Sequence, residues 1–224
     1  MYTITLVNQK GGSGKSTLAE CLAVAAYLDG KAVAVLDMDP QGSIYAWKKR
    51  RSESDPIVLS VQPANVEDEW QRVRDAGADF VFIDTPARLN DWAMKAAELA
   101  DLVIVPSKAT IKDLERVTAS IKLVNAAEVR PTVVVLNQVR PQLERSQEAE
   151  EFIRRHSIPV CPGRIGHRVA FEDSDTLGQT PQETEPKGKA ADEIAAVYRY
   201  VRKLVRESTR AQVDNPTRRK AGAQ

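Results

Sequence analysis

The sequence predicts an α/β fold, a doubly wound and mostly parallel sheet with helices on both faces. Three observations support this prediction. Short runs rich in valine and isoleucine recur along the chain with little polar alternation, which is typical of strands covered on both faces. Segments of helical character separate these runs. A glycine-rich stretch, NQKGGSGKST at residues 8–17, follows the first run and opens the first helical segment.

The order of elements follows from these runs. Parallel strands are expected at residues 2–8, 32–37, 79–84, 101–106 and 132–137, with weaker candidates at 57–61 and 158–161. Helices are expected between them, at residues 15–29, 43–51, 65–76, 90–99, 111–126 and 145–155. A final helix is expected at 187–207, because its apolar residues recur at helical spacing. We expect one domain over residues 1–207 and a basic, disordered tail over 208–224, which has almost no large apolar residues.

Composition excludes several classes of protein. With 42% hydrophobic and 28% charged residues, the 224-residue chain has an ordinary globular composition. The N-terminus has no signal-peptide pattern, and no run is long enough to span a membrane. Cys21 and Cys161 are expected to be buried thiols rather than a disulfide or metal site. The net charge of +1 predicts no polyanion partner, although a balanced total can conceal a basic face.

Polar residues follow the predicted strands where each strand ends, at Asn8, Asp37, Asp84, Ser107 and Asn137. In open α/β sheets, ligands bind beyond the carboxyl ends of the strands. Several such residues, together with a glycine-rich loop after the first strand, therefore favour a ligand site at this edge.

The loop at residues 9–17 has the context of a phosphate-binding loop, because it joins a strand to a helix. Its glycines let the backbone turn tightly and direct N–H groups at phosphate oxygens. Lys15 is expected to reach the β- and γ-phosphates, and Ser16 to bind Mg²⁺ through its hydroxyl. The expected nucleotide contacts are Gly11, Gly12, Ser13, Gly14, Lys15, Ser16 and Thr17. The alternative is a glycine-rich turn that only joins strand to helix.

The stretch KGGSGKST resembles the deviant Walker A motif of the ParA/MinD family of P-loop ATPases, whose pattern is Lys-Gly-Gly-x-Gly-Lys-Ser/Thr. Lys10 matches the family's additional lysine. The resemblance implies that two chains enclose two ATP molecules and that Lys10 of one chain reaches the nucleotide of the other. A lysine supplied in this way offsets phosphate charge only in the dimer, so nucleotide would control dimerisation. The alternative is a solvated surface lysine.

Other motifs fit the same resemblance. The segment VLDMDPQGS at 35–43 resembles the family's Asp-x-Asp-Pro-Gln-Gly segment, which implies that Asp39 positions or activates the attacking water and that Asp37 supports the Mg²⁺ shell. FVFIDTPA at 80–87 has the form of a Walker B strand, so Asp84 is expected to hold Mg²⁺. The resemblance also implies an adenine contact for Asn137. Each of these residues could instead belong to a simple turn.

Two further positions extend the comparison with the family. Arg88, in the segment ARLN, departs from the small residues that the family often has after this strand. Asp113, downstream of Pro106, matches a family aspartate that would line the dimer-facing side. Specific motifs cover roughly residues 1–140, and the remaining third matches in pattern only.

The C-terminal region is basic. From residue 199 onward it contains Arg199, Arg202, Lys203, Arg206, Arg210, Arg218, Arg219 and Lys220, against Glu207 and Asp214. This charge is compatible with electrostatic contact to DNA, to which Arg164 and Arg168 would add. The alternative is a solvated basic helix face.

These observations predict a small ParA-like ATPase that hydrolyses ATP with Mg²⁺ and forms an ATP-dependent homodimer. By resemblance, it would bind DNA without sequence preference and drive partition with a ParB-like centromere-binding partner, in the cytoplasm on the nucleoid. Two alternatives are positioning of a protein cargo, such as a chemoreceptor cluster or a microcompartment, and an accessory or scaffold role in conjugative DNA transfer. The tail lacks the bulky apolar residues of a MinD-like membrane helix. The cysteines are not placed to hold an iron–sulfur cluster.

Overall fold

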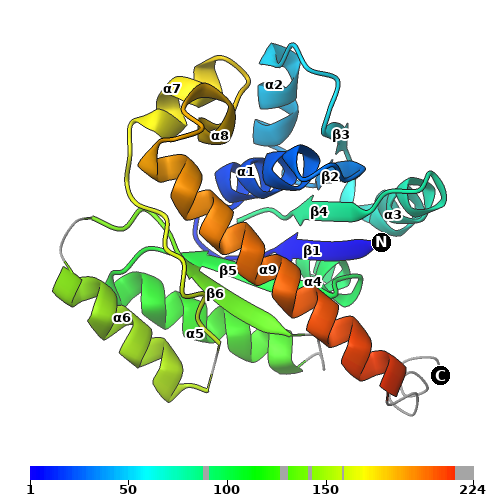
Figure 1. Ribbon diagram of the computed structural model, residues 1–224. Coiled ribbons are helices and arrows are strands. Elements are labelled where there is room, and N and C mark those ends of the chain that lie inside the picture. The colour runs from blue at the N-terminus through cyan, green and yellow to red at the C-terminus, as the bar shows by residue number, and fades with distance from the viewer. Residues whose placement is uncertain (88–90, 127–130, 141–142, 158, 215–224) are drawn as a thin grey trace.

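The computed structural model describes residues 1–87, 91–126, 131–140, 143–157 and 159–214. Among these residues, six strands form one sheet in the order β3-β2-β4-β1-β5-β6 (Figure 1). Every pairing is parallel. The strands are β1 (Tyr2–Leu6), β2 (Val33–Asp37), β3 (Ile57–Ser60), β4 (Phe80–Asp84), β5 (Leu102–Ser107) and β6 (Thr132–Leu136). The predicted doubly wound sheet is therefore confirmed.

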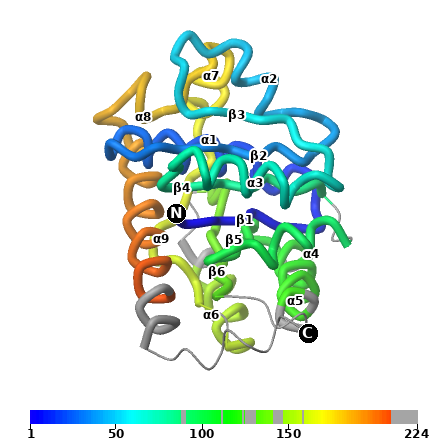
Figure 2. The backbone as a smooth tube through the Cα atoms, turned by 90° about the vertical axis from the view of Figure 1, so that its right-hand side faces the viewer, coloured from blue at the N-terminus to red at the C-terminus, as the bar shows by residue number. Residues whose placement is uncertain are grey.

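Helices cover both faces of the sheet (Figure 2). They are α1 (Lys15–Leu28), α2 (Ser43–Arg50), α3 (Val66–Asp75), α4 (Asp91–Glu98), α5 (Ile111–Ala126), α6 (Leu143–Arg155), α7 (Ala170–Thr176), α8 (Pro181–Thr184) and α9 (Lys189–Asp214). A short 3₁₀ turn, Pro63–Asn65, precedes α3. One face packs against α1, α2 and α9, and the other against α3, α4, α5 and α6.

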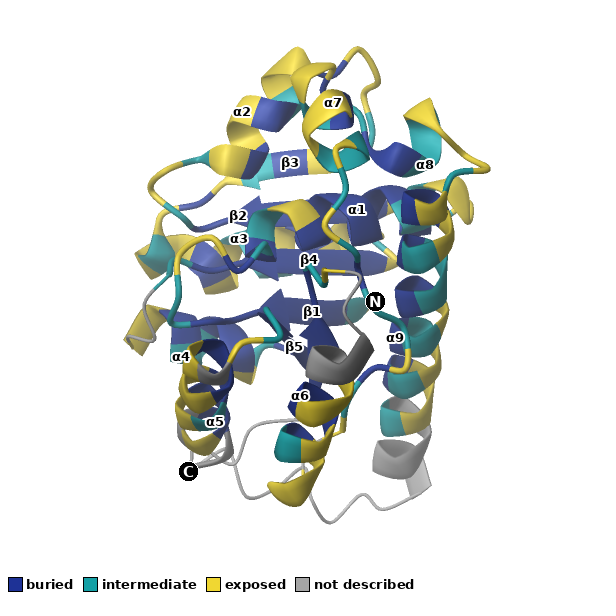
Figure 3. Ribbon diagram, turned by 90° about the vertical axis from the view of Figure 1, so that its left-hand side faces the viewer, coloured by how far each residue is buried: buried dark blue, intermediate teal, exposed yellow. Residues whose placement is uncertain are grey.

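The two faces of the sheet divide the core according to the alternation of side chains along each strand. In β1, Ile4 and Leu6 join the cluster beneath α1 and α9, whereas Val7, the residue after the strand, joins the cluster beneath α5. The polar Thr5 is buried on the second face, where its hydroxyl donates to the carbonyl oxygen of Ala96 at 2.9 Å. Figure 3 shows the central strands buried between the helices. The sheet is therefore a rigid platform for the loops at its carboxyl edge.

The C-terminal third differs most from the sequence-based prediction. Of the candidate strand at 158–161, residue 158 lies outside the described residues, and residues 159–161 form only an isolated bridge, between Val160 and Val134. The short helices α7 and α8 were not predicted; α7 has only Ser174 buried, so it lacks the apolar stripe that marks a helix in sequence. Helix α9 runs to Asp214, seven residues past the predicted end at 207. Residues 215–224 of the predicted tail lie outside the described residues.

Two other features of the chain bear on its chemistry. Cys21 and Cys161 are both free and buried, as predicted. In the part of the chain that the structure describes, no helix combines the length and apolarity that crossing a bilayer requires.

Candidate functional site

The polar residues that end the strands lie together at one edge of the sheet. Asp37 pairs in register with Asp84, because β2 and β4 are neighbours. Asn8 joins the ends of β1 and β5, since its amide nitrogen donates to the carbonyl oxygen of Pro106 at 2.6 Å. These residues are buried, and so are Ser107 and Asn137. Parallel pairing therefore brings these side chains to the edge where the sequence predicts a ligand site.

The glycine-rich loop begins directly after β1 and ends at α1. Gly14 precedes the helix in the left-handed conformation, with φ at 85°, and a side chain there would approach the Asn137 amide nitrogen to 2.0 Å. Glycine is required at this position both by the backbone conformation and by the close approach. The hydroxyl oxygen of Ser13 is buried in this loop and has no hydrogen-bond partner in the part of the chain that the structure describes. The loop thus presents an unpartnered polar atom beside the N-terminus of α1.

Asn137 fixes the loop to the end of β6. Its amide nitrogen donates to the carbonyl oxygen of Ser13 at 2.9 Å, and its amide oxygen accepts from the backbone N–H of Gln138 at 2.9 Å. Asn137 also lines the cavity described below. The amide nitrogen and the amide oxygen of Asn137, the side chain predicted to contact adenine, thus both form hydrogen bonds within the protein.

Asp84 and Ser16 form the centre of the site. The hydroxyl of Ser16 donates to one carboxylate oxygen of Asp84 at 2.6 Å, while the other oxygen has no partner among the described residues. Burial raises the pKa of Asp84 to about 7, against the opposing effects of the Ser16 hydrogen bond and the Lys15 charge. A buried carboxylate oxygen without a partner, next to a hydroxyl, fits a Mg²⁺ ion or one of its bound waters. Two of the three predicted metal ligands, Ser16 and Asp84, are therefore adjacent.

Lys15 lies beside this pair. Burial lowers the pKa of its ammonium, whereas the charges of Asp84 and Asp39 act in the opposite direction. A buried ammonium facing two carboxylates leaves a cation where a phosphate would be stabilised.

Asp37 has a structural function here. One of its oxygens accepts from the N–H of Asp39 at 3.2 Å, and the other accepts from the N–H of Tyr45 at 3.0 Å. Burial raises its pKa, although backbone hydrogen bonds oppose the shift. Asp37 thus orders both the turn that carries Asp39 and the first turn of α2. Its two carboxylate oxygens, which are expected to support the Mg²⁺ shell, each accept a hydrogen bond from a backbone N–H group.

Lys10 is held within its own chain. Its ammonium contacts a carboxylate oxygen of Asp113 at 2.5 Å, and its backbone N–H donates to the amide oxygen of Asn8. Burial would raise the pKa of Asp113, but hydrogen bonds from Lys10 and Thr110 hold it below its ordinary value. The Lys10 side chain is still 32% exposed, so it reaches the surface beside the loop.

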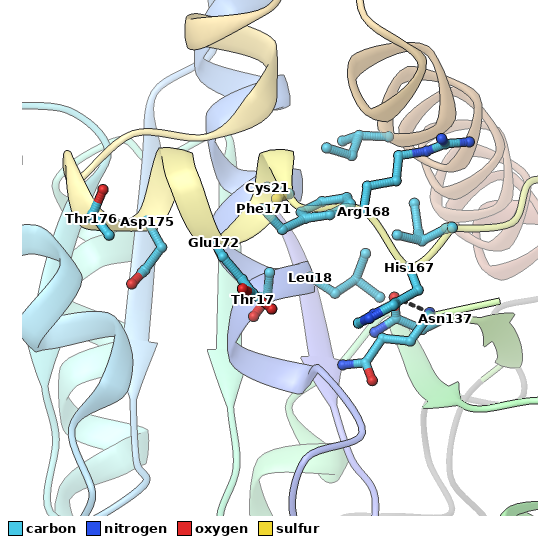
Figure 4. A pocket seen from close by; sticks show the side chains of 14 residues that line it. Thr17, Leu18, Cys21, Asn137, His167, Arg168, Phe171, Glu172, Asp175 and Thr176 are labelled. Carbon is cyan, nitrogen blue, oxygen red and sulfur yellow. Dashed lines mark hydrogen bonds between the residues drawn. The ribbon is translucent and has the colours of Figure 1, made fainter. Parts of the chain in front are cut away.

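A cavity of about 420 Å³ opens beside the loop, between α1, α7 and the segment that follows β6 (Figure 4). Its volume is within the range of about 300–1,000 Å³ that small-molecule sites occupy. It is lined by Thr17, Leu18, Cys21, Asn137, Gln138, Ile165, Gly166, His167, Arg168, Phe171, Glu172, Asp175, Thr176 and Ile194. In Figure 4, Thr17 and Glu172 lie close together, while Asp175 and Thr176 lie further along α7. No sequence motif indicated that residues after position 160 line this cavity.

Within the described residues, no cluster of three or more histidine, cysteine or acidic side chains could hold a metal ion by itself. Arg88 lies outside the described residues.

Replacing Asp84 with asparagine is expected to stabilise the protein free of Mg²⁺ and nucleotide. The folded carboxyl titrates near pH 7, whereas its ordinary pKa is 3.8, so the folded state binds more protons between these values. Protonation of Asp84 therefore stabilises the folded state fully below pH 3.8, and this stabilisation is lost as the pH rises to about 7. Thermal unfolding should therefore show Asp84→Asn melting about 5 °C above the parent at pH 8 and less at pH 5. An equal difference at both pH values would contradict this assignment.

Comparison with known proteins places the site in context. A profile of the CobQ/CobB/MinD/ParA nucleotide binding domain matches residues 4–181. The chromosome-partitioning ATPase Soj of Thermus thermophilus is 27% identical, over 92% of this chain and 97% of Soj. Protein virC1 of Rhizobium radiobacter is 25% identical, over 76% of this chain and 79% of virC1. The septum site-determining protein MinD of Pyrococcus horikoshii, in complex with Mg-ADP, superposes with a TM-score of 0.74 at 19% identity, over 92% and 98% of the two chains.

Proposed function

Because this chain belongs to the ParA/MinD family of P-loop ATPases, we propose that it hydrolyses ATP with Mg²⁺ and forms an ATP-dependent homodimer that binds DNA without sequence preference. With a ParB-like centromere-binding partner, the dimer would drive plasmid or chromosome partition. The protein would then act in the cytoplasm, associated with the nucleoid.

One observation carries the enzymatic part of the proposal. Lys15, Ser16 and the unpartnered oxygen of Asp84 lie at the N-terminus of α1, next to a cavity large enough for a small molecule. The helix N-terminus and the loop N–H groups favour phosphate at this position. The cavity beside Thr17 is then the place for the nucleoside.

Each residue of the site has a distinct task in this proposal. Bound Mg²⁺ would neutralise charge on the β- and γ-phosphates. Ser16 and Asp84 would hold that ion, and Lys15 would bind the same phosphates. Asp39, in the turn that Asp37 orders, would orient the attacking water. Asn137 keeps Gly14 and Ser13 against the end of β6, so it fixes the loop that binds the phosphates.

Dimerisation is assigned to Lys10. The side chain lies at the surface and is paired with Asp113, so it would have to leave Asp113 to reach the nucleotide of a second chain. That exchange is favourable only where a more negative group, such as a triphosphate, is presented to Lys10. The dimer would therefore form with ATP bound.

DNA contact is assigned to the outer face of α9. The described basic side chains on this face differ in whether they form ion pairs. Arg202 pairs with Asp29 at 2.5 Å, and Lys203 lies 3.8 Å from Glu207. Arg199 and Arg206 are exposed and make no ion pair with another described residue. Arg164 and Arg168, which the sequence offered as additional contacts, pair with Glu150 and Glu193. The side chain of Arg210 and residues 215–224, with their three basic side chains, lie outside the described part.

Removing the two unpaired arginines is expected to weaken DNA binding by the ATP-loaded protein. The double variant Arg199→Ala/Arg206→Ala should bind about tenfold more weakly at low salt, with a salt slope smaller by about two per chain, because each lost phosphate contact releases one fewer counterion. Fluorescence anisotropy with a random duplex at several salt concentrations measures both quantities. The variant Arg72→Ala/Arg74→Ala, which removes the same charge from exposed positions on α3, should bind as the parent does.

The proposal as a whole is tested by sedimentation with ADP or ATP, followed by DNA binding of each species. A dimer that requires ATP and alone binds DNA supports it. A dimer that ignores DNA at low salt would remove the partition function and favour a cargo-positioning or scaffold role.

A further inference from the structure

Helix α7 forms the wall of the cavity across from α1, and it supplies Phe171, Glu172, Asp175 and Thr176 to the lining. The helix is short and only Ser174 of its residues is buried, so its own packing holds it only weakly. Figures 1 and 3 show it beside α2, the helix that follows the turn carrying Asp39. The contacts between α7 and α2 therefore decide where this wall of the cavity lies.

Arg50, the last residue of α2, holds one of the lining residues directly. One terminal nitrogen of its guanidinium lies 2.9 Å from each carboxylate oxygen of Asp175, and Nε donates to the backbone carbonyl oxygen of Asp175 at 3.1 Å. Both side chains are partly exposed. A pair at this exposure adds little to global stability, so its effect is mainly on the position of Asp175.

Arg51 makes a buried connection from the same end of α2. Its side chain is 0% exposed. Its two terminal nitrogens donate to the two carboxylate oxygens of Glu183 on α8, at 2.9 and 2.6 Å. One of them also donates to the carbonyl oxygen of Gly178, and Nε donates to that of Asp55. A guanidinium bonded in this way has a single orientation, so α2 and the segment after α7 are fixed relative to each other.

Gly178, just after α7, permits this close contact. Its φ is +65°, and a Cβ atom there would lie 2.3 Å from the backbone nitrogen of Arg51. Because a Cβ atom cannot lie within 3.0 Å of a backbone atom in another segment, a side chain at residue 178 would force one of the two segments to move. The indole Nε1 of Trp47 also donates to the carbonyl oxygen of Gln179 at 3.1 Å. The C-terminal half of α2 is therefore in backbone-to-backbone contact with the end of α7.

The other end of α2 belongs to the phosphate side of the site. Asp37 accepts from the N–H of Tyr45 in the first turn of α2 and from the N–H of Asp39. One short helix thus contacts the turn of Asp39 at its start and the wall of the cavity at its end.

We propose that Arg50 and Arg51 are positioning residues of the nucleotide site, which fix α7 against α2 and so set the affinity of the cavity for the nucleoside part of the ligand. This inference rests on the proposed nucleotide binding. It assigns the two arginines no contact with the phosphates, so they should affect binding only of ligands that carry a nucleoside.

Two probes separate these contributions. Pyrophosphate requires only the phosphate loop, whereas ADP also requires the cavity. By isothermal titration calorimetry with Mg²⁺, Arg50→Ala should bind ADP about five- to tenfold more weakly than the parent and pyrophosphate within about twofold. Arg72→Ala removes an arginine paired with Glu69 on the surface of α3, and it should leave both affinities unchanged.

A second pair of variants tests the backbone contact. Gly178→Ala and Gly30→Ala both place a side chain at positive φ, at +65° and +73°, but only at Gly178 does the added atom meet another segment. Both variants are expected to melt at lower temperature than the parent. Only Gly178→Ala should weaken ADP binding relative to pyrophosphate binding, by more than the Arg50 variant does.

The outcomes are distinguishable. Two results would overturn the positioning role while leaving the proposed function in place. In the first, Arg50→Ala and Gly178→Ala lose affinity for ADP and for pyrophosphate in parallel. In the second, both variants bind ADP with parental affinity. A parent that binds pyrophosphate and ADP equally would show that the cavity does not hold the nucleoside, which also overturns it. A parent that binds neither probe would remove the proposed function itself.

Discussion

Replacing Lys10 with alanine is expected to abolish ATP-dependent dimerisation while each chain still binds one nucleotide. Lys10 is 32% exposed and contacts Asp113, and in the structure it takes no part in the Ser16–Asp84 pair. Its removal therefore leaves the Ser16–Asp84 pair in place and deletes the cation that a partner chain would receive, while the buried Asp113 keeps the hydrogen bond from Thr110. Loss of one such charge should lower ATP hydrolysis about a hundredfold to a thousandfold. Sedimentation velocity and phosphate release with ATP measure the two effects.

The control for this variant is Lys122→Ala, which removes an exposed lysine of α5. It should dimerise and hydrolyse ATP as the parent does. A Lys10→Ala protein that forms an ATP dimer at parental concentrations would show that Lys10 is an ordinary intrachain ion-pair partner of Asp113.

Replacing Lys15 with alanine is expected to abolish nucleotide binding itself, whereas the Lys10 variant should retain it. Lys15 is buried beside Asp84 and Asp39, where a bound triphosphate would add further negative charge. A lost charge-assisted hydrogen bond costs about 1.5–3 kcal/mol, and a lysine that reaches two phosphates makes about two of them. We expect ADP affinity to fall about a hundredfold or more, and hydrolysis to become undetectable. Calorimetry with ADP and phosphate release measure these losses.

Thermal melting distinguishes this effect from misfolding. Without nucleotide, Lys15→Ala should unfold cooperatively near the parental temperature, because removal of a buried ammonium also removes its desolvation cost. Affinity for ADP equal to that of the parent would exclude Lys15 from the phosphate site.

Much of the fold and the centre of the site could be predicted from the sequence because they depend on local patterns. The buried strands are continuous apolar runs, and their ends agree with the structure within two residues. The phosphate loop and Asp84 each lie next to such a strand, so parallel pairing brings them together without further information. Ser16 and Asp84 are accordingly in direct contact, as the two motifs implied.

The parts that could not be predicted depend on contacts between distant residues. Lys10 and Asp113 are 103 residues apart, and Arg51 and Glu183 are 132 apart. No local pattern marks either pair. The apolar run at 158–161 predicts a weak strand, but its described residues 159–161 bridge β6 at one position only. The backbone hydrogen bonds that the Asp37 oxygens accept from Asp39 and Tyr45 are likewise not revealed by the sequence, and the part of Asp37 in a Mg²⁺ shell stays a prediction.

The position of β1 in the sheet has a consequence for synthesis of the chain. β1 is translated before β4 and β5, its neighbours in the sheet, which end at Asp84 and Ser107. The glycine-rich loop therefore has no framework until Ser107 has been translated. The cavity beside the loop needs still more of the chain, because Ile194 on α9 contributes to its lining.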